Sequence, residues 1–288
     1  MSKYVIFTDS GCDIEPALLQ EWGVRYINLM FRFDHLDRDF RNDEMPVKEF
    51  YQQMRDGHVA KTNAINSETF REAFATALSE GYDVFYLGFS SGLSTTYKQS
   101  ELAAEDLANE FPDRKIVTVD TLCASAGQGL LVKLAVEKRD AGATPDELAA
   151  YVREVLPHLA HWFTVEDLVY LKRGGRVSPT VALVGSMLSI KPIMHVDDEG
   201  HLIKTGAVRG RKTSLKTLAD KVFETAEDPT NGKIFISHGD CLEDAESLRD
   251  AMVERGAHNV ELITNIGAVI GAHSGPGTMA VFFLAKQR

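Results

Sequence analysis

Short runs of β-branched and aromatic residues alternate with longer helical patterns through the first half of the chain. Four such runs predict strands at Tyr4–Thr8, Arg25–Phe31, Val84–Phe89 and Lys115–Val119. Four helical patterns accompany them at Pro46–Arg55, Ser67–Glu80, Ser94–Phe111 and Ala124–Ala141. Because parallel strands need crossover connections, which are usually helices, this alternation predicts a parallel α/β sheet.

The pattern changes after a helix predicted at Thr144–His158. Two strand-like runs, Ile190–Val196 and His201–Val208, flank Asp197–Gly200 and predict a hairpin, which parallel units do not need. The later elements are predicted as helices at Leu215–Thr225 and Leu242–Glu254, and as strands at Lys233–His238, Asn259–Asn265 and Thr278–Leu284. We therefore predict an α/β fold of two domains, a parallel one at residues 1–160 and a mixed-sheet one at residues 161–288.

The formal net charge of −11 argues against nucleic acid and anionic membrane surfaces as main partners. The three cysteines lie far apart and show no zinc-ligand spacing, so we expect no disulfide framework, metal or cofactor. The start of the chain reaches Asp9 too soon for a signal peptide, and Val181–Ile190, the longest apolar stretch, is about half a membrane span. We expect a cytoplasmic protein without membrane insertion.

Three polar loops follow predicted strands in the first half, at Asp9–Asp13, Ser90–Thr96 and Asp120–Thr121. The carboxyl ends of parallel strands open into one crevice, where ligands usually bind. A helix-capping role alone would equally explain Ser94 or Asp13 taken singly. Convergence of several such loops on one edge favours a binding site.

Gly88–Gly92 matches the G-x-S-x-G pattern of a nucleophile elbow between a strand and a helix. Asp240 and His273 follow Ser90 in the order of the hydrolase triad, so a serine esterase is the rival hypothesis. Only three predicted strands precede this serine, and no HGGG-type oxyanion segment lies upstream, which argues against it.

A glycine-dense segment, Gly267–Gly277, places His273 in a predicted turn before the last strand. Glycines there let the backbone approach a ligand closely. His273 is a candidate donor to an anion, with a purely structural hydrogen-bonding role as the alternative. His158 and His161 are three residues apart at a predicted helix end, but no third metal ligand accompanies them.

Basic residues gather at two places in the second half. Leu171–Arg176 carries three cations around a diglycine turn, next to the apolar Val181–Ile190. A cationic loop beside an apolar helix suits a ligand with an acidic head and a hydrocarbon tail, although core packing alone would explain the helix. A second cluster, between Lys204 and Lys221, predicts either attraction of an acidic partner or a solvated helix face.

Five segments in this order resemble the DegV family, and the similarity runs from Tyr4 to Leu284. The first three are Phe7–Asp13, Lys61–Asn66 and Ser90–Tyr97, which are similar to D-S-x-x-D, K-T-S-x-P-S and S-S-x-L-S-G-T-Y. The other two are Leu168–Ser178 and Gly271–Thr278. One short motif matches easily by chance, whereas five in register across the chain make the resemblance specific.

The resemblance implies a two-domain α/β fold with a long-chain fatty acid in a tunnel between the domains. By the same resemblance, Thr62 and Ser94 hydrogen-bond the carboxylate with His273 close by, and Arg176, or Arg173 with it, supports this polar network. We add Ser91, in the same loop as Ser94, as a further candidate. The family further implies an acyl carrier that is no enzyme by itself, whose bound acid a separate dihydroxyacetone-kinase-like subunit phosphorylates for phospholipid synthesis. We expect that subunit to dock at Arg209, Arg211 and Lys212. No GxxxxGK[ST] loop is present, so the nucleotide would come with the partner.

Two segments depart from the family pattern. Thr95 stands where a glycine is expected after Ser94, which affects how closely that loop approaches the carboxylate. Ile65 stands where proline is expected, and Asn63, Ala64 and Asn66 also differ, so the loop after Thr62 lacks the φ restraint of proline. These departures bear on the identity or affinity of the ligand more than on the existence of the site.

Overall fold

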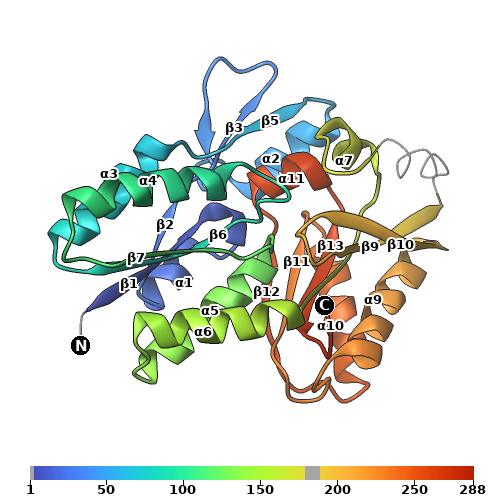
Figure 1. Cartoon of the computed structure of the whole chain (residues 1–288). Helices are drawn as coiled ribbons and strands as arrows, with labels where there is room; N and C mark the ends of the chain where they lie inside the picture. The colour runs from blue at the N-terminus through green and yellow to red at the C-terminus, as the bar shows by residue number, and fades with distance from the viewer. Residues whose placement is uncertain (1–2, 179–188) are drawn as a thin grey trace.

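Neighbouring residues of the first strand, β1 (Tyr4–Asp9), face two different cores. Ile6 packs with Phe85 in one core, while Val5 and Phe7 pack in another. This alternation follows from the period of two along a strand, and it requires helices on both faces of the sheet. The computed structural model describes residues 3–178 and 189–288 (Figure 1). Residues 181–188 of the predicted apolar segment Val181–Ile190 therefore lie outside the described residues.

The first sheet has four parallel strands in the order β2-β1-β6-β7. Beside β1 it contains β2 (Val24–Ile27), β6 (Asp83–Gly88) and β7 (Ile116–Asp120). Helices α3 (Ser67–Ser79) and α4 (Thr96–Glu110) cover one face. Helices α1 (Pro16–Glu21), α5 (Ala126–Asp140) and α6 (Pro145–Val155) cover the other (Figure 1). The predicted parallel α/β architecture of this half is confirmed.

The strand predicted at Arg25–Phe31 is wrong as a single element, because two strands of different sheets occupy it. The first is β2, and the second is β3 (Met30–Phe33), which pairs with β5 (Ala60–Asn63) and β4 (Phe40–Arg41) in a small antiparallel sheet. At the break, the Leu29 N–H donates to the Ser10 hydroxyl at 2.9 Å instead of to a strand. The hydrophobic pattern of the sequence gives no sign of this break between β2 and β3.

The second sheet is mixed and has six strands in the order β10-β9-β8-β13-β11-β12. The strands are β8 (Leu159–Thr164), β9 (Ile190–Val196), β10 (Leu202–Arg209), β11 (Ile234–His238), β12 (Val260–Asn265) and β13 (Met279–Leu284). The predicted β9–β10 hairpin and the mixed character are confirmed, with β11 and β12 as the parallel pair. The strand β8 was not predicted, because its residues directly follow a predicted helix.

Helices cover both faces of the second sheet as well. On one face, α9 (Arg211–Thr225) and α10 (Leu242–Val253) form a third core with β11 and β13. On the other face, α5 packs against β8, β11 and β13, and it also contacts β6 of the first sheet. Ten of the eleven residues from Ala126 to Val136 in α5 are buried, because the helix lies between the two sheets.

Residues near the end of the chain return to the small antiparallel sheet. The segment predicted as a turn at Gly267–Gly277 contains a short helix, α11 (Ala268–Ser274), which ends at Gly275 with φ +83°. This helix packs against α2 (Val47–Arg55), α7 (Val169–Arg173), β3 and β5. Its alanine and valine side chains join the core beneath Phe50, which stabilises a helix where glycine content predicted a turn.

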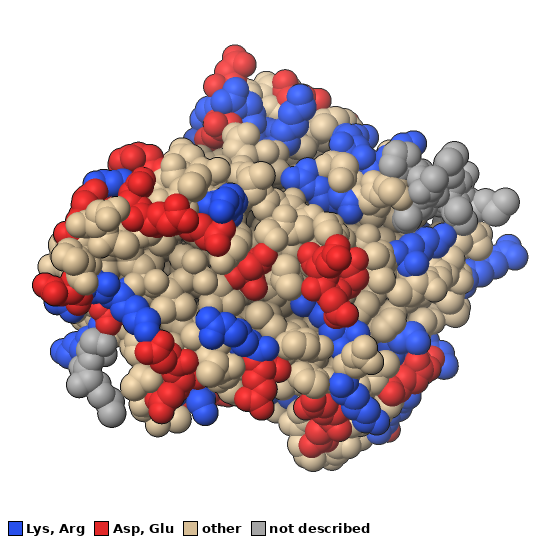
Figure 2. Space-filling model, in the orientation of Figure 1, with Lys and Arg blue, Asp and Glu red and all other residues tan. Residues whose placement is uncertain are grey.

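The surface carries charges of both signs. Figure 2 shows Lys and Arg interspersed with Asp and Glu over the face drawn, without one dominant patch. No helix in the described part of the chain is both long enough and apolar enough to cross a membrane.

Candidate ligand-binding site

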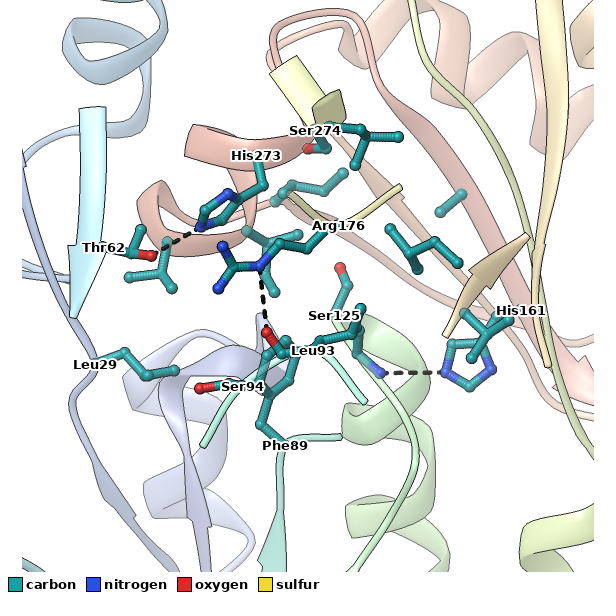
Figure 3. A pocket seen from close by; sticks show the side chains of 18 of the residues that line it. Leu29, Thr62, Phe89, Leu93, Ser94, Ser125, His161, Arg176, His273 and Ser274 are labelled. Carbon is teal, nitrogen blue, oxygen red and sulfur yellow. Dashed lines mark hydrogen bonds between the residues drawn. The ribbon is translucent and has the colours of Figure 1, made fainter. Parts of the chain in front are cut away.

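A cavity of about 510 Å³ lies between the two sheets and is lined mainly by apolar side chains. Apolar lining comes from Phe163, Val196, Leu202, Val269, Ile270 and Phe282. Figure 3 shows Thr62, His273, Arg176 and Ser94 gathered on one side of this space, with His161 at the opposite side. Its volume falls within the range of roughly 300–1,000 Å³ that is typical of small-molecule sites. The cavity thus combines an apolar body with a polar end.

The polar loops that follow β1, β6 and β7 are hydrogen-bonded to one another, and residues from the loops after β6 and β7, but none from the loop after β1, line the cavity. The Ser125 N–H donates to the Gly11 carbonyl at 2.8 Å, and the Ser90 N–H donates to the Cys123 carbonyl at 3.0 Å. The carboxylate of Asp9 accepts from the Phe89 N–H at 2.8 Å. Asp9 is buried and holds the loops together, so it is a structural acid and no part of the cavity lining.

Thr62 and His273 are hydrogen-bonded to each other across the polar end. Thr62 lies on β5 and His273 on α11, and the Thr62 hydroxyl is 2.8 Å from His273 Nε2. Both side chains line the cavity. Pairing of Phe31 with Thr62 in the small sheet fixes the threonine, and packing of α11 against β5 brings the histidine to it.

His273 is neutral at pH 7. Burial, together with the nearby positive charge of Arg176, lowers the pKa of His273 to about 4. Its Nδ1 atom is buried and has no hydrogen-bond partner among the described residues. A hydrogen on Nε2 is therefore favoured, since a buried unpaired N–H costs more than an unpaired acceptor. Nε2–H then donates to Thr62, whose own hydroxyl hydrogen is left for a ligand.

The first glycine of the diglycine turn makes room for this histidine. A β-carbon added at Gly174 would lie 2.1 Å from His273 Nδ1, far inside van der Waals contact. The φ of Gly174 is an ordinary −72°, so the constraint is space and not backbone conformation. The basic turn and the glycine-dense segment, predicted separately from the sequence, are thus packed against each other.

Ser94 serves both as a helix-start residue and as part of the cavity lining. Its hydroxyl oxygen accepts from the Thr96 N–H at 3.2 Å and lies 2.9 Å from the Thr96 hydroxyl. The helix predicted to begin at Ser94 begins at Thr96, because Ser94 is in the preceding loop. Ser91 also lines the cavity, and its N–H donates to Asp120.

The two arginines of the basic turn have different surroundings. Arg176 lines the cavity, and its guanidinium donates to the carbonyls of Leu93 and Gly174. Among the described residues no carboxylate forms a salt bridge with it, and burial lowers its pKa. Arg173 is exposed, lies outside the cavity lining and stacks over the Tyr170 ring at 5.7 Å. Arg176, and not Arg173, therefore brings positive charge to the cavity.

Residues from the first half of the chain hold α11 in place. The carboxylate of Asp13 accepts from the Gly267 N–H at 2.9 Å, and the side-chain amide oxygen of Asn42 accepts from the Val269 N–H at 2.8 Å. The Tyr51 hydroxyl donates to the Ile266 carbonyl at 2.9 Å. These supports could not be predicted from the sequence, because no local pattern marks Asn42 or Tyr51 as a contact of α11.

The three residues of the hydrolase hypothesis are each hydrogen-bonded to other groups. Ser90 is fully buried, and its hydroxyl donates to the Gly200 carbonyl at 2.9 Å. Asp240 pairs with Arg55 at 2.6 Å, and His273 pairs with Thr62. These hydrogen bonds do not form the serine–histidine–aspartate relay that acyl transfer requires.

The basic cluster expected to attract a partner is partly neutralised. Arg211 forms a salt bridge with Asp244 at 2.8 Å, which makes it a structural residue at the start of α9. Arg209 and Lys212 are exposed, and no salt bridge is formed by either within the described residues. Lys216 and Lys221 pair with Asp220 and Glu224 on the same helix.

One group of possible metal ligands occurs in the part of the chain that the structure describes. Asp34, His35 and His58 have ligand atoms within 4.8 Å of one another, and none of them lines the cavity. His158 and His161 do not form a ligand pair. The Nδ1 atom of His158 bonds to the Ala285 carbonyl, and that of His161 to the Leu159 carbonyl.

Comparison with known proteins finds close relatives along the whole chain. A family model described as "Uncharacterised protein, DegV family" matches residues 3–286. A DegV domain-containing protein of Clostridium perfringens is 42% identical over 100% of this chain and 99% of its own length. A DegV domain-containing protein of Streptococcus pyogenes is 34% identical over 99% of each chain.

Solved structures share the fold. A DegV family protein from Thermus thermophilus, described as fatty acid binding, superposes with a TM-score of 0.88 at 29% identity, over 98% of this chain and 99% of that one. A DegV lipid-binding protein from Thermotoga maritima superposes with a TM-score of 0.87 at 28% identity, over 99% of both chains.

Proposed function

Because this chain belongs to the DegV family, we propose that it binds a long-chain fatty acid in the cavity between its two sheets. The proposal rests on one arrangement, the Thr62–His273 hydrogen bond beside Ser94 and Arg176 at the polar end of an apolar cavity. Fatty acid or lipid binding by the Thermus and Thermotoga proteins supports it. We place the ligand between the regions 1–160 and 161–288, and the protein in the cytoplasm.

The polar end suits a carboxylate because that group only accepts hydrogen bonds. The hydroxyl of Thr62 receives a hydrogen from neutral His273 and can pass its own to the ligand. Ser94 and Ser91 add hydroxyls, and Arg176 supplies an unpaired positive charge. A buried carboxylate requires several donors of this kind to offset its desolvation. Arg173 contributes no direct contact in this arrangement.

The apolar part of the cavity suits the hydrocarbon tail. Burying a C16 tail at about 0.8 kcal/mol per methylene gains on the order of 10 kcal/mol before association and ordering costs. The apolar lining by Phe163, Val269 and Phe282 provides that environment. Hydrophobic burial thus supplies affinity, and the polar end supplies orientation.

Lipid extraction followed by mass spectrometry tests the proposal on the purified protein. We expect an acyl chain at near-stoichiometric amount, and binding of hexadecanoate after delipidation. A protein that carries no acyl chain and does not take up hexadecanoate would overturn the proposal. Labelling of Ser90 by a fluorophosphonate would instead support the esterase hypothesis.

We further propose that the bound acid is presented to a separate ATP-dependent kinase subunit of the dihydroxyacetone-kinase-like type. Phosphoryl transfer needs nucleotide and Mg²⁺, and this sequence contains no P-loop pattern. Exposed Arg209 and Lys212 are the docking residues we favour, with Arg211 holding α9 beside them through Asp244. Acyl phosphate formation that requires both the kinase subunit and this protein would support the role.

A further inference from the structure

Thr96 joins the two loops that carry the proposed carboxylate ligands. It is fully buried at the start of α4, and its hydroxyl oxygen accepts from the Ile65 N–H at 3.4 Å. The same hydroxyl lies 2.9 Å from that of Ser94. Ile65 follows Thr62 by three residues, so one hydroxyl group touches both loops.

The number of hydroxyl hydrogens and lone pairs fixes which of Thr96 and Ser94 is the donor in the hydrogen bond between them. A hydroxyl has one hydrogen and two acceptor lone pairs. In the buried surroundings of Thr96, the Ser94 oxygen is the acceptor within reach of its hydrogen. Ser94 thus accepts from both the Thr96 hydroxyl and the Thr96 N–H. With both lone pairs used, the hydrogen of Ser94 points away from Thr96, toward the cavity that Ser94 lines.

We infer that Thr96 is a specificity-determining residue, which obliges Ser94 to donate and so selects a carboxylate over an alcohol of the same chain length. The inference rests on the proposed fatty-acid site. A carboxylate can accept from Ser94, Thr62 and Arg176 at once. An alcohol can accept as well, but its own hydrogen would find no free acceptor on Ser94. Thr96 acts through Ser94 and is a positioning residue without ligand contact.

The Thr96→Val variant removes the hydroxyl at nearly constant volume, and Thr96→Ser keeps the hydroxyl. In Thr96→Val, Ser94 loses one donor and can rotate to accept from an alcohol. We expect the ratio of hexadecanoate to hexadecanol affinity to fall by up to about tenfold in Thr96→Val, because the alcohol gains one hydrogen bond to Ser94 while the carboxylate keeps its own. Thr96→Ser should restore the ratio to within about threefold of the original protein.

Binding of both probes to the delipidated protein, measured by calorimetry, decides the matter. An unchanged ratio in Thr96→Val would overturn the inference, whereas failure of the unmodified protein to bind hexadecanoate would overturn the proposed function itself. A double-mutant cycle with Ser94→Ala separates an effect through Ser94 from a general packing effect. In a protein that already carries Ser94→Ala, adding Thr96→Val should leave the ratio of hexadecanoate to hexadecanol affinity unchanged. If Thr96→Val does not fold, Thr96→Cys replaces it, because a thiol is only a weak hydrogen-bond donor. Thr96→Cys should lower the ratio of hexadecanoate to hexadecanol affinity. An unchanged ratio in that variant would equally overturn the inference.

Discussion

The carboxylate of Asp13 accepts a hydrogen bond from the backbone N–H of Gly267 at 2.9 Å. Asp13 follows β1, and Gly267 precedes α11, the helix that carries His273. The hydroxyl of Ser125 donates to the other carboxylate oxygen. A buried acid from the start of the chain thereby fixes the position of a site residue from its end.

The environment of Asp13 predicts a pH dependence of stability. Burial raises the pKa of Asp13 to about 7, above the value of about 3.9 expected in the unfolded chain. The folded protein then binds the proton more tightly, so the contribution of Asp13 to stability increases as pH falls from about 7 to about 4. Relative to Asp13→Asn, the unmodified protein should gain up to about 4 kcal/mol over that range. Chemical unfolding at pH 7.5 and 5 checks this, and a constant difference would contradict it.

The environment of His273 predicts a pH dependence of folding stability with the opposite sign. Its pKa of about 4 lies below the unfolded value of about 6.5, so its contribution to stability is present above pH 6.5 and is lost as pH falls toward 4. The unmodified protein should lose up to about 3 kcal/mol relative to His273→Gln over that range. An NMR titration should also place the His273 midpoint well below 6, and a bound carboxylate should raise it.

Gly174→Ala tests the packing of the diglycine turn. The new methyl group would lie 2.1 Å from His273 Nδ1 and must displace the imidazole from Thr62. We expect about 1–3 kcal/mol of destabilisation from overpacking, and hexadecanoate affinity roughly tenfold lower. Gly206→Ala in β10 is the matched control, because a β-carbon there meets nothing within 4 Å. Equal effects of the two substitutions would argue against the packing role.

Removing the two hydroxyls tests the carboxylate site directly. Thr62→Ala and Ser94→Ala each delete one hydrogen bond to a charged group, worth about 1.5–3 kcal/mol, so each should weaken hexadecanoate binding roughly tenfold to a hundredfold. Calorimetric titration of the delipidated protein measures the effect. Thr217→Ala and Ser247→Ala on α9 and α10 are controls whose hydroxyls bond only to their own helices. Unchanged binding in Thr62→Ala with Ser94→Ala would place the carboxylate elsewhere.

Charge reversal tests the proposed docking residues. Arg209→Glu with Lys212→Glu should slow association with an acidic kinase surface and reduce its salt dependence, without changing fatty-acid binding. Lys48→Glu, on the exposed face of α2, is the control. Arg211→Glu should in addition destabilise the fold, because it breaks the salt bridge with Asp244. Association kinetics by surface plasmon resonance would show the difference, and equal rates for all variants would exclude this patch.

Local patterns in the sequence were sufficient for most of the first half of the fold. Short runs of β-branched and aromatic residues predicted β1, β6 and β7, and longer helical patterns between them predicted α3, α4 and α5. Prediction failed at β8 and at the β2–β3 break. There, pairing of β8 with the distant strands β13 and β9, and a single hydrogen bond from Leu29 to Ser10, decide the structure.

The sequence by itself determined an α/β fold and marked Ser94 and His273 as candidates from strand ends and glycines, while Thr62 rested on family resemblance. Only the tertiary structure decided that Thr62 meets His273, that Arg176 and not Arg173 faces the cavity, and that Ser90 is buried. The physical reason is distance along the chain. Thr62 and His273 are 211 residues apart, and packing of α11 against β5, held by Asp13 and Asn42, brings them together. Periodicity reports which face of an element is buried, but not which distant element covers it.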